Sequence, residues 1–316
     1  MKRIGNLFNS ICSLDNLRLA QLKARQGKQD QYGVKVFDRN PDANLADLSD
    51  MLFYKEFTTS AYKVFTVTDP KEREVYGLPF YPDRIVQHAI MNHLEKPFTD
   101  AFTADTYSSI KRRGIGRFDK NLKAALRNVP ATQYCLQVDI RKFYPSIDHA
   151  ILKAQLRRKF KDPDLLWLLD DIIDSAPGVP IGNYTSQFFA NYYLTGFDHW
   201  IKEQLRVKYY FRYCDDIVIL AADKSSLHRI RGLIQDYLAL NLKLTLKKNY
   251  KVFPVSAGID VCGYVYYHGY SLLRKSIKQS FARAVVRKAP QQSINSYIGW
   301  AKHCNSGNLV KKLLAA

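Results

Sequence analysis

Two adjacent carboxylates interrupt an apolar and aromatic run, RYCDDIVIL, at residues 212–220. Removing one ionised carboxylate from water costs free energy, and two side by side cost more because they also repel each other. Asp215 and Asp216 therefore lie either at a solvent-exposed turn or beside a cation that a third partner helps to hold. The candidate partner is Asp139, which lies in the alternating stretch LQVDI much earlier in the chain.

The chemistry of these three residues points to a divalent cation. Three unneutralised carboxylates a few ångströms apart would raise at least one pKa and strain the surrounding sheet. Mg²⁺ removes that conflict, because it is a hard cation that takes oxygen ligands. Two such ions about 3.5–4 Å apart can activate an attacking hydroxyl and stabilise a leaving pyrophosphate. Asp139, Asp215 and Asp216 are therefore the predicted catalytic and metal-binding residues, with two Mg²⁺ ions as the expected cofactor.

Strands must bring these carboxylates together. Adjacent side chains of a strand point to opposite faces, so Asp215 and Asp216 can converge only if the chain turns at that point. The aromatic stretch before the pair and the apolar stretch after it supply two strands for such a turn. If the strand that contains Asp139 is their neighbour, Asp139 and Asp215 lie side by side with Asp216 close by.

The remaining elements follow from hydrophobic periodicity and turn chemistry. Helices are predicted in the first 60 or so residues and over 83–97, 116–128, 149–160, 165–173 and 225–241, and a glycine-rich loop that begins at 178 leads into a long helix. Hairpins are predicted over 62–80 and 258–269, a strand over 242–248, and a basic helical tail from 272. The pattern predicts an α+β fold, in which an antiparallel sheet carries helices on one face.

Composition favours a nucleic-acid partner. The 316 residues carry 48 Lys and Arg against 29 Asp and Glu, a net charge of +19, and from Val261 onward there are nine basic residues and no acidic one. Aromatic residues make up 13% of the chain. Phosphate neutralisation combined with aromatic surfaces for bases is typical of nucleic-acid-binding proteins. The alternative is a solvated basic protein without a specific partner.

Other classes of protein are disfavoured. No apolar run reaches 18 residues, which argues against a membrane span. The five cysteines are scattered and form no CxxC pair, as expected for reduced cytosolic thiols rather than a zinc site or disulfide framework. We therefore expect a cytoplasmic location.

Several segments resemble the reverse transcriptases of prokaryotic and phage retroelements. Residues 213–216 match the family's YxDD signature, residues 138–148 (VDIRKFYPSID) resemble its first catalytic motif, residues 178–194 its loop-helix motif, and residues 258–269 its primer-grip hairpin. The resemblance runs in order from about Tyr62 to Asn308. It implies an RNA-templated DNA polymerase with a right-hand fold, prokaryotic or phage-encoded, that takes template RNA, a primer or cDNA strand and dNTPs. The implied parts are an N-terminal helical extension (1–60), fingers (61–133), an antiparallel-sheet palm with part of the fingers (134–270) and a short basic helical thumb (271–316).

The resemblance also implies residue roles. The three aspartates and the carbonyl of Ile140 would hold the metals, and Tyr144 would stack under the incoming sugar and exclude a 2′-hydroxyl. Further nucleotide contacts would be Lys71, Arg73, Ile181, Gly182 and Gln187, and nucleic-acid contacts would be Lys111, Arg112, Arg113, Arg117, Gly263, Tyr264, Arg274 and Lys275. Lys247 or Lys248 would protonate pyrophosphate, or both are plain surface lysines. Arg84 is either a phosphate contact or part of an ion pair at a helix start, and Gly178 and Gly182 would let the backbone approach nucleotide and template.

One motif suggests a branch of the family. Many reverse transcriptases carry Gln between the Pro and Gly of the loop-helix motif, whereas this chain has Pro180-Ile181-Gly182. The form PIGNxTSQ resembles the reverse transcriptases of diversity-generating retroelements. That resemblance implies error-prone copying at adenines and a partner, the small basic helical accessory variability determinant. Loss of a hydrogen-bonding group at Ile181 gives a physical account of low fidelity; alternatively, Ile181 only packs under its loop.

Two other functions compete with this interpretation. Antiphage-defence reverse transcriptases share similar motifs, and a catalytically silent, RNA-binding palm would retain the basic surface. The three acidic residues argue against silence, and a two-metal nuclease is disfavoured because no nuclease segment follows the tail.

Overall fold

The computed structural model describes residues 3–68 and 72–315, so that Lys71 lies outside the described residues. The chain folds into two compact units, each assembled from three stretches of sequence. The first unit comprises Met1–Phe102, Lys142–Gly196 and Ala239–Leu244, and the second comprises Thr103–Arg141, Phe197–Leu238 and Thr245–Ala316. Within the described residues, no helix is long and apolar enough to cross a membrane.

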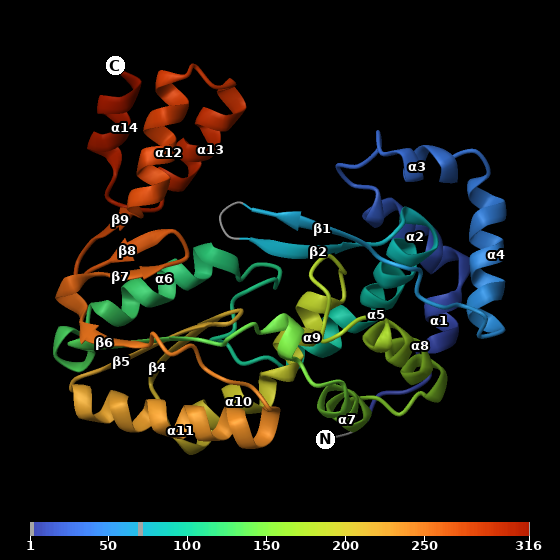
Figure 1. The fold of residues 1–316 in the computed structure, drawn as a ribbon, viewed down its shortest axis with the longest axis horizontal. Helices are drawn as coiled ribbons and strands as arrows, with labels where there is room; N and C mark the ends of the chain where they lie inside the picture. The colour runs from blue at the N-terminus through green and yellow to red at the C-terminus, as the bar shows by residue number, and fades with distance from the viewer. Residues whose placement is uncertain (1–2, 69–71, 316) are drawn as a thin grey trace. The chain divides into compact units, whose positions relative to one another are not determined.

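The first unit is mainly helical, as the sequence predicted for the first 60 residues. Its helices are α1 (Phe8–Cys12), α2 (Leu14–Ala24), α3 (Tyr32–Phe37), α4 (Pro41–Phe53), α5 (Ile85–Ala101), α7 (His149–Lys159), α8 (Pro163–Asp174) and α9 (Ser186–Tyr193). Figure 1 shows α1 and α2 beside α5, with α4 next to α1 and α2. The Ser13 side chain caps α2 by accepting a hydrogen bond from the Asn16 N–H, and Leu17, Ala20 and Ala24 bury one helical face.

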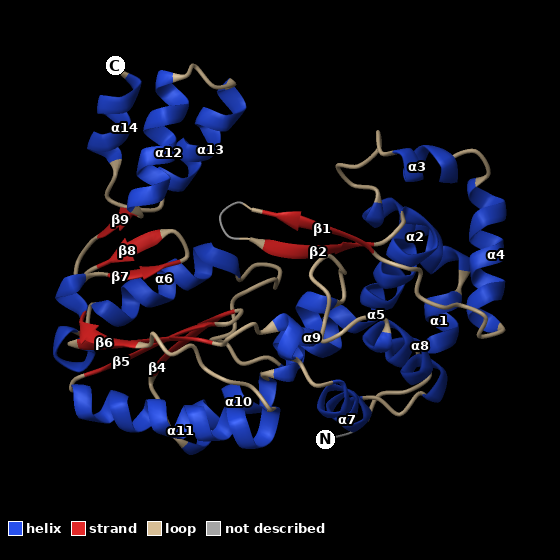
Figure 2. Cartoon of the chain, in the orientation of Figure 1, coloured by secondary structure: helices blue, strands red, loops and turns tan. Residues whose placement is uncertain are grey.

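A two-stranded hairpin projects from these helices. Strands β1 (Lys63–Val67) and β2 (Arg73–Gly77) pair antiparallel, with Lys63 opposite Gly77. Figure 2 shows this hairpin as the sheet of the first unit. The helical turn η1 (Phe80–Arg84) leads from the hairpin into α5. The predicted hairpin over 62–80 is therefore confirmed for its described residues.

The second unit contains a four-stranded antiparallel sheet. Its strands are β3 (Tyr134–Asp139), β4 (Tyr209–Tyr213), β5 (Asp216–Ala221) and β6 (Lys251–Pro254), in the order β4-β5-β3-β6. Residues 217–220 of β5 are all buried, which means that both faces of the sheet are covered. Helix α6 (Gly114–Leu126) lies on one face and α11 (Lys224–Leu242) on the other (Figure 1). The expectation of helices on one face only was therefore wrong.

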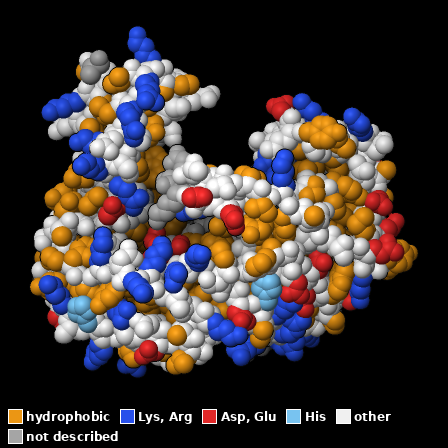
Figure 3. All heavy atoms as spheres, in the orientation of Figure 1, with side chains coloured by type: hydrophobic (Ala, Val, Ile, Leu, Met, Phe, Trp, Pro, Cys, Tyr) orange, Lys and Arg blue, Asp and Glu red, His pale blue; other side chains and the backbone are white. Residues whose placement is uncertain are grey.

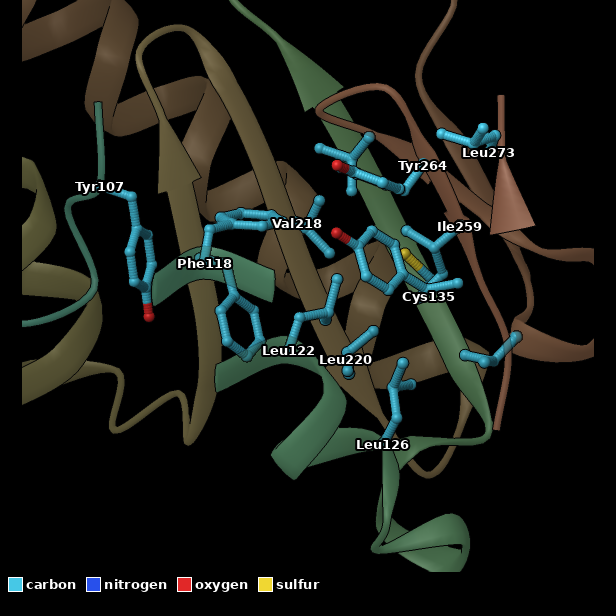
Figure 4. Packing of buried hydrophobic residues seen from close by; sticks show 14 of the residues in the cluster. Tyr107, Phe118, Leu122, Leu126, Cys135, Val218, Leu220, Ile259, Tyr264 and Leu273 are labelled. Atoms are coloured by element: carbon cyan, nitrogen blue, oxygen red, sulfur yellow. The ribbon is translucent and has the colours of Figure 1, made fainter. Parts of the chain in front are cut away.

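A second, smaller sheet completes the core of this unit. Strands β7 (Ile259–Val261), β8 (Tyr264–Tyr266) and β9 (Ser271–Leu273) form an antiparallel meander. Figure 4 shows Phe118 and Leu122 of α6 packing with Val218 of β5 and Ile259 of β7 in one hydrophobic cluster. The predicted hairpin over 258–269 thus forms the first two strands of this meander.

Three helices follow the small sheet, and short turns connect the other elements. The helices are α12 (Lys275–Val286), α13 (Gln291–Ala301) and α14 (Gly307–Leu314), and they pack on one another. On the face in Figure 3, Lys and Arg side chains are spread over these helices without an acidic side chain among them.

The remaining helical elements are α10 (Thr195–His199), η2 (Val129–Thr132), η3 (Tyr144–Ser146), η4 (Trp200–Gln204) and η5 (Val255–Ala257).

The strand predicted over 242–248 is wrong. Helix α11 continues to Leu242, and Lys243 then adopts a left-handed φ of 51°, which breaks any extended run. Beyond it, the Arg141 N–H donates to the Thr245 carbonyl (2.8 Å) and the Lys247 N–H to the Asp139 carbonyl (2.9 Å). The regular strand in this region is β6, further along the chain.

Candidate active site

The carboxylate pair lies at a tight turn between two strands. Tyr213 of β4 pairs with Asp216 of β5, so Cys214 and Asp215 form the turn. Cys214 has a φ of 58°, a left-handed conformation that a two-residue hairpin turn requires. The predicted turn at the aspartates is confirmed.

The strand that carries Asp139 is the neighbour of β5. Asp139 pairs with Asp216 across the sheet, and the Ile140 N–H donates to the Asp215 carbonyl at 3.3 Å. The backbones of all three aspartates therefore meet where β3 ends and β5 begins. The alternating stretch LQVDI ends one residue after Asp139. Antiparallel pairing places this end of the strand beside the turn between β4 and β5.

The side chains divide into a half-buried pair, Asp139 and Asp215, and an exposed third member. Burial raises the pKa of Asp215, and the nearby charge of Asp139 raises it further, while Lys247 opposes both. Asp139 Oδ2 accepts a hydrogen bond from Lys247 Nζ at 2.5 Å, and its buried Oδ1 has no hydrogen-bond partner among the described residues. Asp216 is exposed. Burial first, and then the charge of Asp216, raises the pKa of the Cys262 thiol to about 12.

This arrangement bears on the predicted metal site. Within residues 3–68 and 72–315, no group of three or more His, Cys, Asp or Glu side chains is arranged to hold a metal ion. Asp139 and Asp215 nevertheless fit a divalent cation, because one has an unpartnered buried oxygen and the other is destabilised as an anion. Lys247 supplies the positive charge next to Asp139 in this structure. Lys248 is exposed, so the geometry distinguishes two lysines that the sequence could not.

A buried ion pair supports the turn. Arg212 and Asp198 side chains are both 0% exposed. Arg212 donates from Nε to Asp198 Oδ1 (2.7 Å), from a terminal nitrogen to Oδ2 (2.5 Å), and from the other terminal nitrogen to the Cys214 carbonyl (3.0 Å). The Tyr210 hydroxyl and the Thr106 hydroxyl also donate to Asp198, at 2.6 and 2.9 Å. Sequence reasoning missed this network, although an arginine inside the buried run YYFRY signals a buried partner.

Most of the predicted nucleotide contacts line one cavity in the first unit. The cavity measures about 240 Å³, and Tyr144, Ile181, Gly182 and Gln187 all line it. Its other lining residues are Lys28, Leu78, Arg84, Gln87, His88, Asn183, Tyr184 and Ser186. Lys28, Gln87 and His88 were not predicted from the sequence. Arg73, the remaining described nucleotide candidate, is exposed at the start of β2.

The glycines of this region have a structural reason. Gly182 has a φ of 131°, and a Cβ there would lie 2.2 Å from the Tyr76 carbonyl oxygen. The Tyr76 N–H donates to the Ile181 carbonyl at 2.7 Å, so the loop packs directly on β2. Gly178 has a φ of 64°, and a Cβ there would lie 2.4 Å from the Tyr144 carbonyl oxygen. The chain's own backbone fills these positions, and contact between Gly182 and a nucleotide stays a prediction.

The predicted nucleic-acid contacts are found in different environments. Lys111, Arg112 and Arg117 are exposed around the start of α6, and Lys275 is exposed at the start of α12. Arg113 instead donates to the carbonyls of Thr103 (2.6 Å) and Thr106 (3.2 Å), and Arg274 pairs with Asp260.

The two candidates in the β7–β8 turn have structural roles. Tyr264 is 2% exposed, and its hydroxyl donates to the Trp300 carbonyl at 3.1 Å. A Cβ at Gly263 would lie 2.2 Å from the Trp300 ring. Packing against α13 thus explains both residues, and the Tyr264 side chain offers no surface to nucleic acid.

Comparison with known proteins identifies the family. Residues 68–266 match the family model described as reverse transcriptase (RNA-dependent DNA polymerase). The chain belongs to the reverse transcriptase family. The matched segment contains the β3–β5 site and most of the cavity-lining residues, with Lys28 as the exception.

Relatives of this reverse transcriptase are distant. It is 23% identical over 267 residues to the protein YkfC of Escherichia coli strain K12, covering 70% of this chain and 68% of that protein. It is 22% identical over 176 residues to the group II intron-encoded protein LtrA of Lactococcus lactis subsp. cremoris, covering 52% of this chain. The chain spans only 28% of the length of LtrA.

A solved structure supports the fold. Apo telomerase from Candida tropicalis matches with a TM-score of 0.52 at 12% sequence identity, covering 72% of this chain and 52% of the telomerase chain. This likeness, together with the antiparallel sheet and its covering helices, confirms the predicted right-hand polymerase fold of the α+β class. The division into fingers, palm and thumb at the stated boundaries stays a prediction.

Proposed function

We propose that this reverse transcriptase is an active RNA-templated DNA polymerase whose reaction centre is the β3–β5 site. The observation that carries the proposal is the register of β3 on β5, which brings Asp139 to the Asp215 turn and leaves Asp139 Oδ1 without a partner among the described residues. In the reaction, the primer 3′-oxygen bonds to the α-phosphorus of a dNTP while the bond to pyrophosphate breaks. When bound, Mg²⁺ activates the hydroxyl and neutralises charge on the leaving group.

The chain's own residues bind and orient the reactants. Asp139 and Asp215 would hold the cations, with Asp216 and the Ile140 carbonyl as the further predicted ligands. In this proposal Lys247, which lies beside Asp139, donates a proton to pyrophosphate.

The first unit supplies the nucleotide contacts. Tyr144 and the loop around Ile181 line the cavity that we assign to the nucleotide. Template RNA, primer or cDNA and dNTPs are the proposed substrates, and the exposed cations around the start of α6 and on α12 are the proposed contacts to nucleic acid.

Primer extension tests the proposal. Full-length protein is incubated with an RNA template, a DNA primer, dNTPs and Mg²⁺, and Asp215→Ala/Asp216→Ala is compared with Asp50→Ala, an exposed acid on α4. We expect extension by wild type and Asp50→Ala and none by the double variant, with primer–template binding retained. If wild type binds primer–template but never extends it, the protein is instead the catalytically silent, RNA-binding palm. The lack of a closed three-carboxylate cluster in the described residues favours this second function.

We also propose the diversity-generating branch, with error-prone copying at adenines and a small basic helical accessory protein. The motif PIGNxTSQ supports it, as does the position of Ile181 in the cavity lining. Because Ile181 has no hydrogen-bonding side chain, correct and incorrect pairs are poorly separated there. Ile181→Gln should lower the adenine error rate by about tenfold or less. Sequencing of the cDNA measures this, and an unchanged rate ends the fidelity account.

A further inference from the structure

The cavity of the first unit holds two cations and no carboxylate in its described lining. Lys28 comes from the turn between α2 and α3, and Arg84 is the last residue of η1, directly before α5. Burial lowers the pKa of Lys28, and the charge of Arg84 lowers it further. Two like charges therefore face one cavity at a cost that an anion between them would remove.

The acid next to Arg84 in the sequence does not belong to this cavity. Asp83 is 1% exposed and is absent from the cavity lining. Its Oδ1 accepts the Ser60 N–H at 2.9 Å, and burial raises its pKa. Arg84 uses its Nε on the Leu78 carbonyl (3.1 Å), a contact that orients its side chain without balancing its charge.

Three residues that line the same cavity carry unsatisfied polar atoms. Ser186 Oγ, Asn183 Oδ1 and His88 Nδ1 are buried atoms without a hydrogen-bond partner in the described part of the chain. The Ser186 and Asn183 residues are only 2% and 5% exposed, and Asn183 is oriented by its amide, which donates to the Tyr62 hydroxyl at 2.8 Å. Buried polar atoms usually have partners, so their concentration around one cavity indicates a polar ligand.

The walls of the cavity suit a nucleotide. His88 stacks on Tyr184 with ring centroids 4.2 Å apart and planes at 12°, and the Tyr184 N–H is held by Gln87 Oε1 at 2.7 Å. Burial first, and then Lys28, Lys23 and Arg84, lowers the pKa of His88 to about 4, so this ring adds a flat neutral surface. Flat rings beside cations are the usual surroundings of bases and phosphates.

We propose that Lys28 and Arg84 together bind one phosphate group of a nucleotide, which makes the turn between α2 and α3 part of the substrate-binding surface. The inference rests on the proposed function for its ligand class. The phosphate belongs either to the template strand or to an incoming dNTP. The volume of about 240 Å³ is smaller than pockets that enclose a whole ligand, which favours one phosphodiester unit of a strand.

Salt-dependent RNA binding tests the proposal without requiring catalysis. Full-length wild type, Lys28→Met and the matched control Lys35→Met, an exposed lysine on α3, are titrated with a labelled single-stranded RNA at several KCl concentrations. Loss of one phosphate contact reduces the slope of log K against log salt by about 0.7 for single strands. We expect Lys28→Met to show that reduction, Lys35→Met to keep the wild-type slope, and Lys28→Arg to restore it.

A second arm distinguishes the source of the phosphate. Binding of dATP in Mg²⁺ is measured by calorimetry on the same proteins. Weaker dATP binding with an unchanged RNA slope assigns the phosphate to the dNTP, and unchanged values in both arms overturn the proposal.

Two controls complete the test. Thermal unfolding verifies that the variants fold, and Lys28→Gln replaces Lys28→Met if the latter does not. Because RNA binding needs no turnover, a protein inactive in primer extension but with the expected slope change would refute the polymerase and keep the phosphate site.

Discussion

The two units treat their cationic side chains in opposite ways. In the second unit, Arg212 is fully buried and donates to the Asp198 carboxylate and to the Cys214 carbonyl. Asp198 also accepts hydrogen bonds from the Tyr210 and Thr106 hydroxyls. In the first unit, Lys28 and Arg84 share a cavity whose described lining has no acid and contains unsatisfied polar atoms. A network whose polar groups are paired with one another fixes backbone geometry, whereas polar groups without partners are available to a ligand.

The difference also has an energetic side. A buried ion pair costs desolvation energy that its attraction barely recovers, so its value lies in geometry. Here that geometry is the Cys214–Asp215 turn, which Arg212 holds through the Cys214 carbonyl. The open cavity carries an energetic cost in the free protein that ligand binding removes.

The largest expected effect comes from breaking the closed network. Asp198→Asn leaves the Arg212 charge buried and unpaired, and should lower the free energy of unfolding by about 3–5 kcal/mol. The matched change Asp100→Asn removes an exposed partner of Lys96 and should cost about 0–1 kcal/mol. Denaturant unfolding measures both. Equal losses would show that the Arg212–Asp198 pair is no scaffold.

A double variant separates stability from positioning. Asp198→Asn/Arg212→Met removes both charges, and should unfold within about 1–2 kcal/mol of wild type because no buried charge is left unpaired. Primer extension should nevertheless stay impaired, since the Cys214 carbonyl has lost its donor. The kcat should fall with KM for dNTP nearly unchanged, because the turn carries the catalytic group. Recovery of stability and kcat together would exclude a positioning role for Arg212.

The smallest effect concerns Asp215 and pH. Its pKa is raised above the ordinary 3.8 by burial and by Asp139. As pH rises from 3.8 to the raised pKa, the unfolded state loses this proton first, so the native state loses stability across that window. Asp215→Asn should therefore be more stable than wild type above the window and no more stable below it. Unfolding curves from pH 3 to 7 measure this, and Mg²⁺ should stabilise wild type more than the variant.

The sequence predicted the strands and the turn at the aspartates because local patterns determine them. That β3 and β5 are neighbours was a hypothesis, which the structure confirms by pairing Asp139 with Asp216. The strand over 242–248 failed because the left-handed Lys243 does not show in an alternating pattern. Tyr264 was misplaced because packing against Trp300 depends on a helix far along the chain.

The complete lining of the cavity could not be predicted from the sequence. Lys28, Arg84 and Tyr184 come from three separated stretches, and no local pattern indicates that they meet. The motif around Ile181 indicated only one part of the cavity lining. The need of Arg212 for a partner could have been predicted, because a charged residue in a buried strand is rarely unpaired. That the partner is Asp198 depends on tertiary structure.

The absence of Asp and Glu from Val261 onward determines which property of the solution acts most strongly on this segment. Its nine Lys and Arg side chains have no carboxylate side chain within the segment to balance their charge. Because dissolved salt screens such charge, ionic strength governs the attraction of this segment to polyanions.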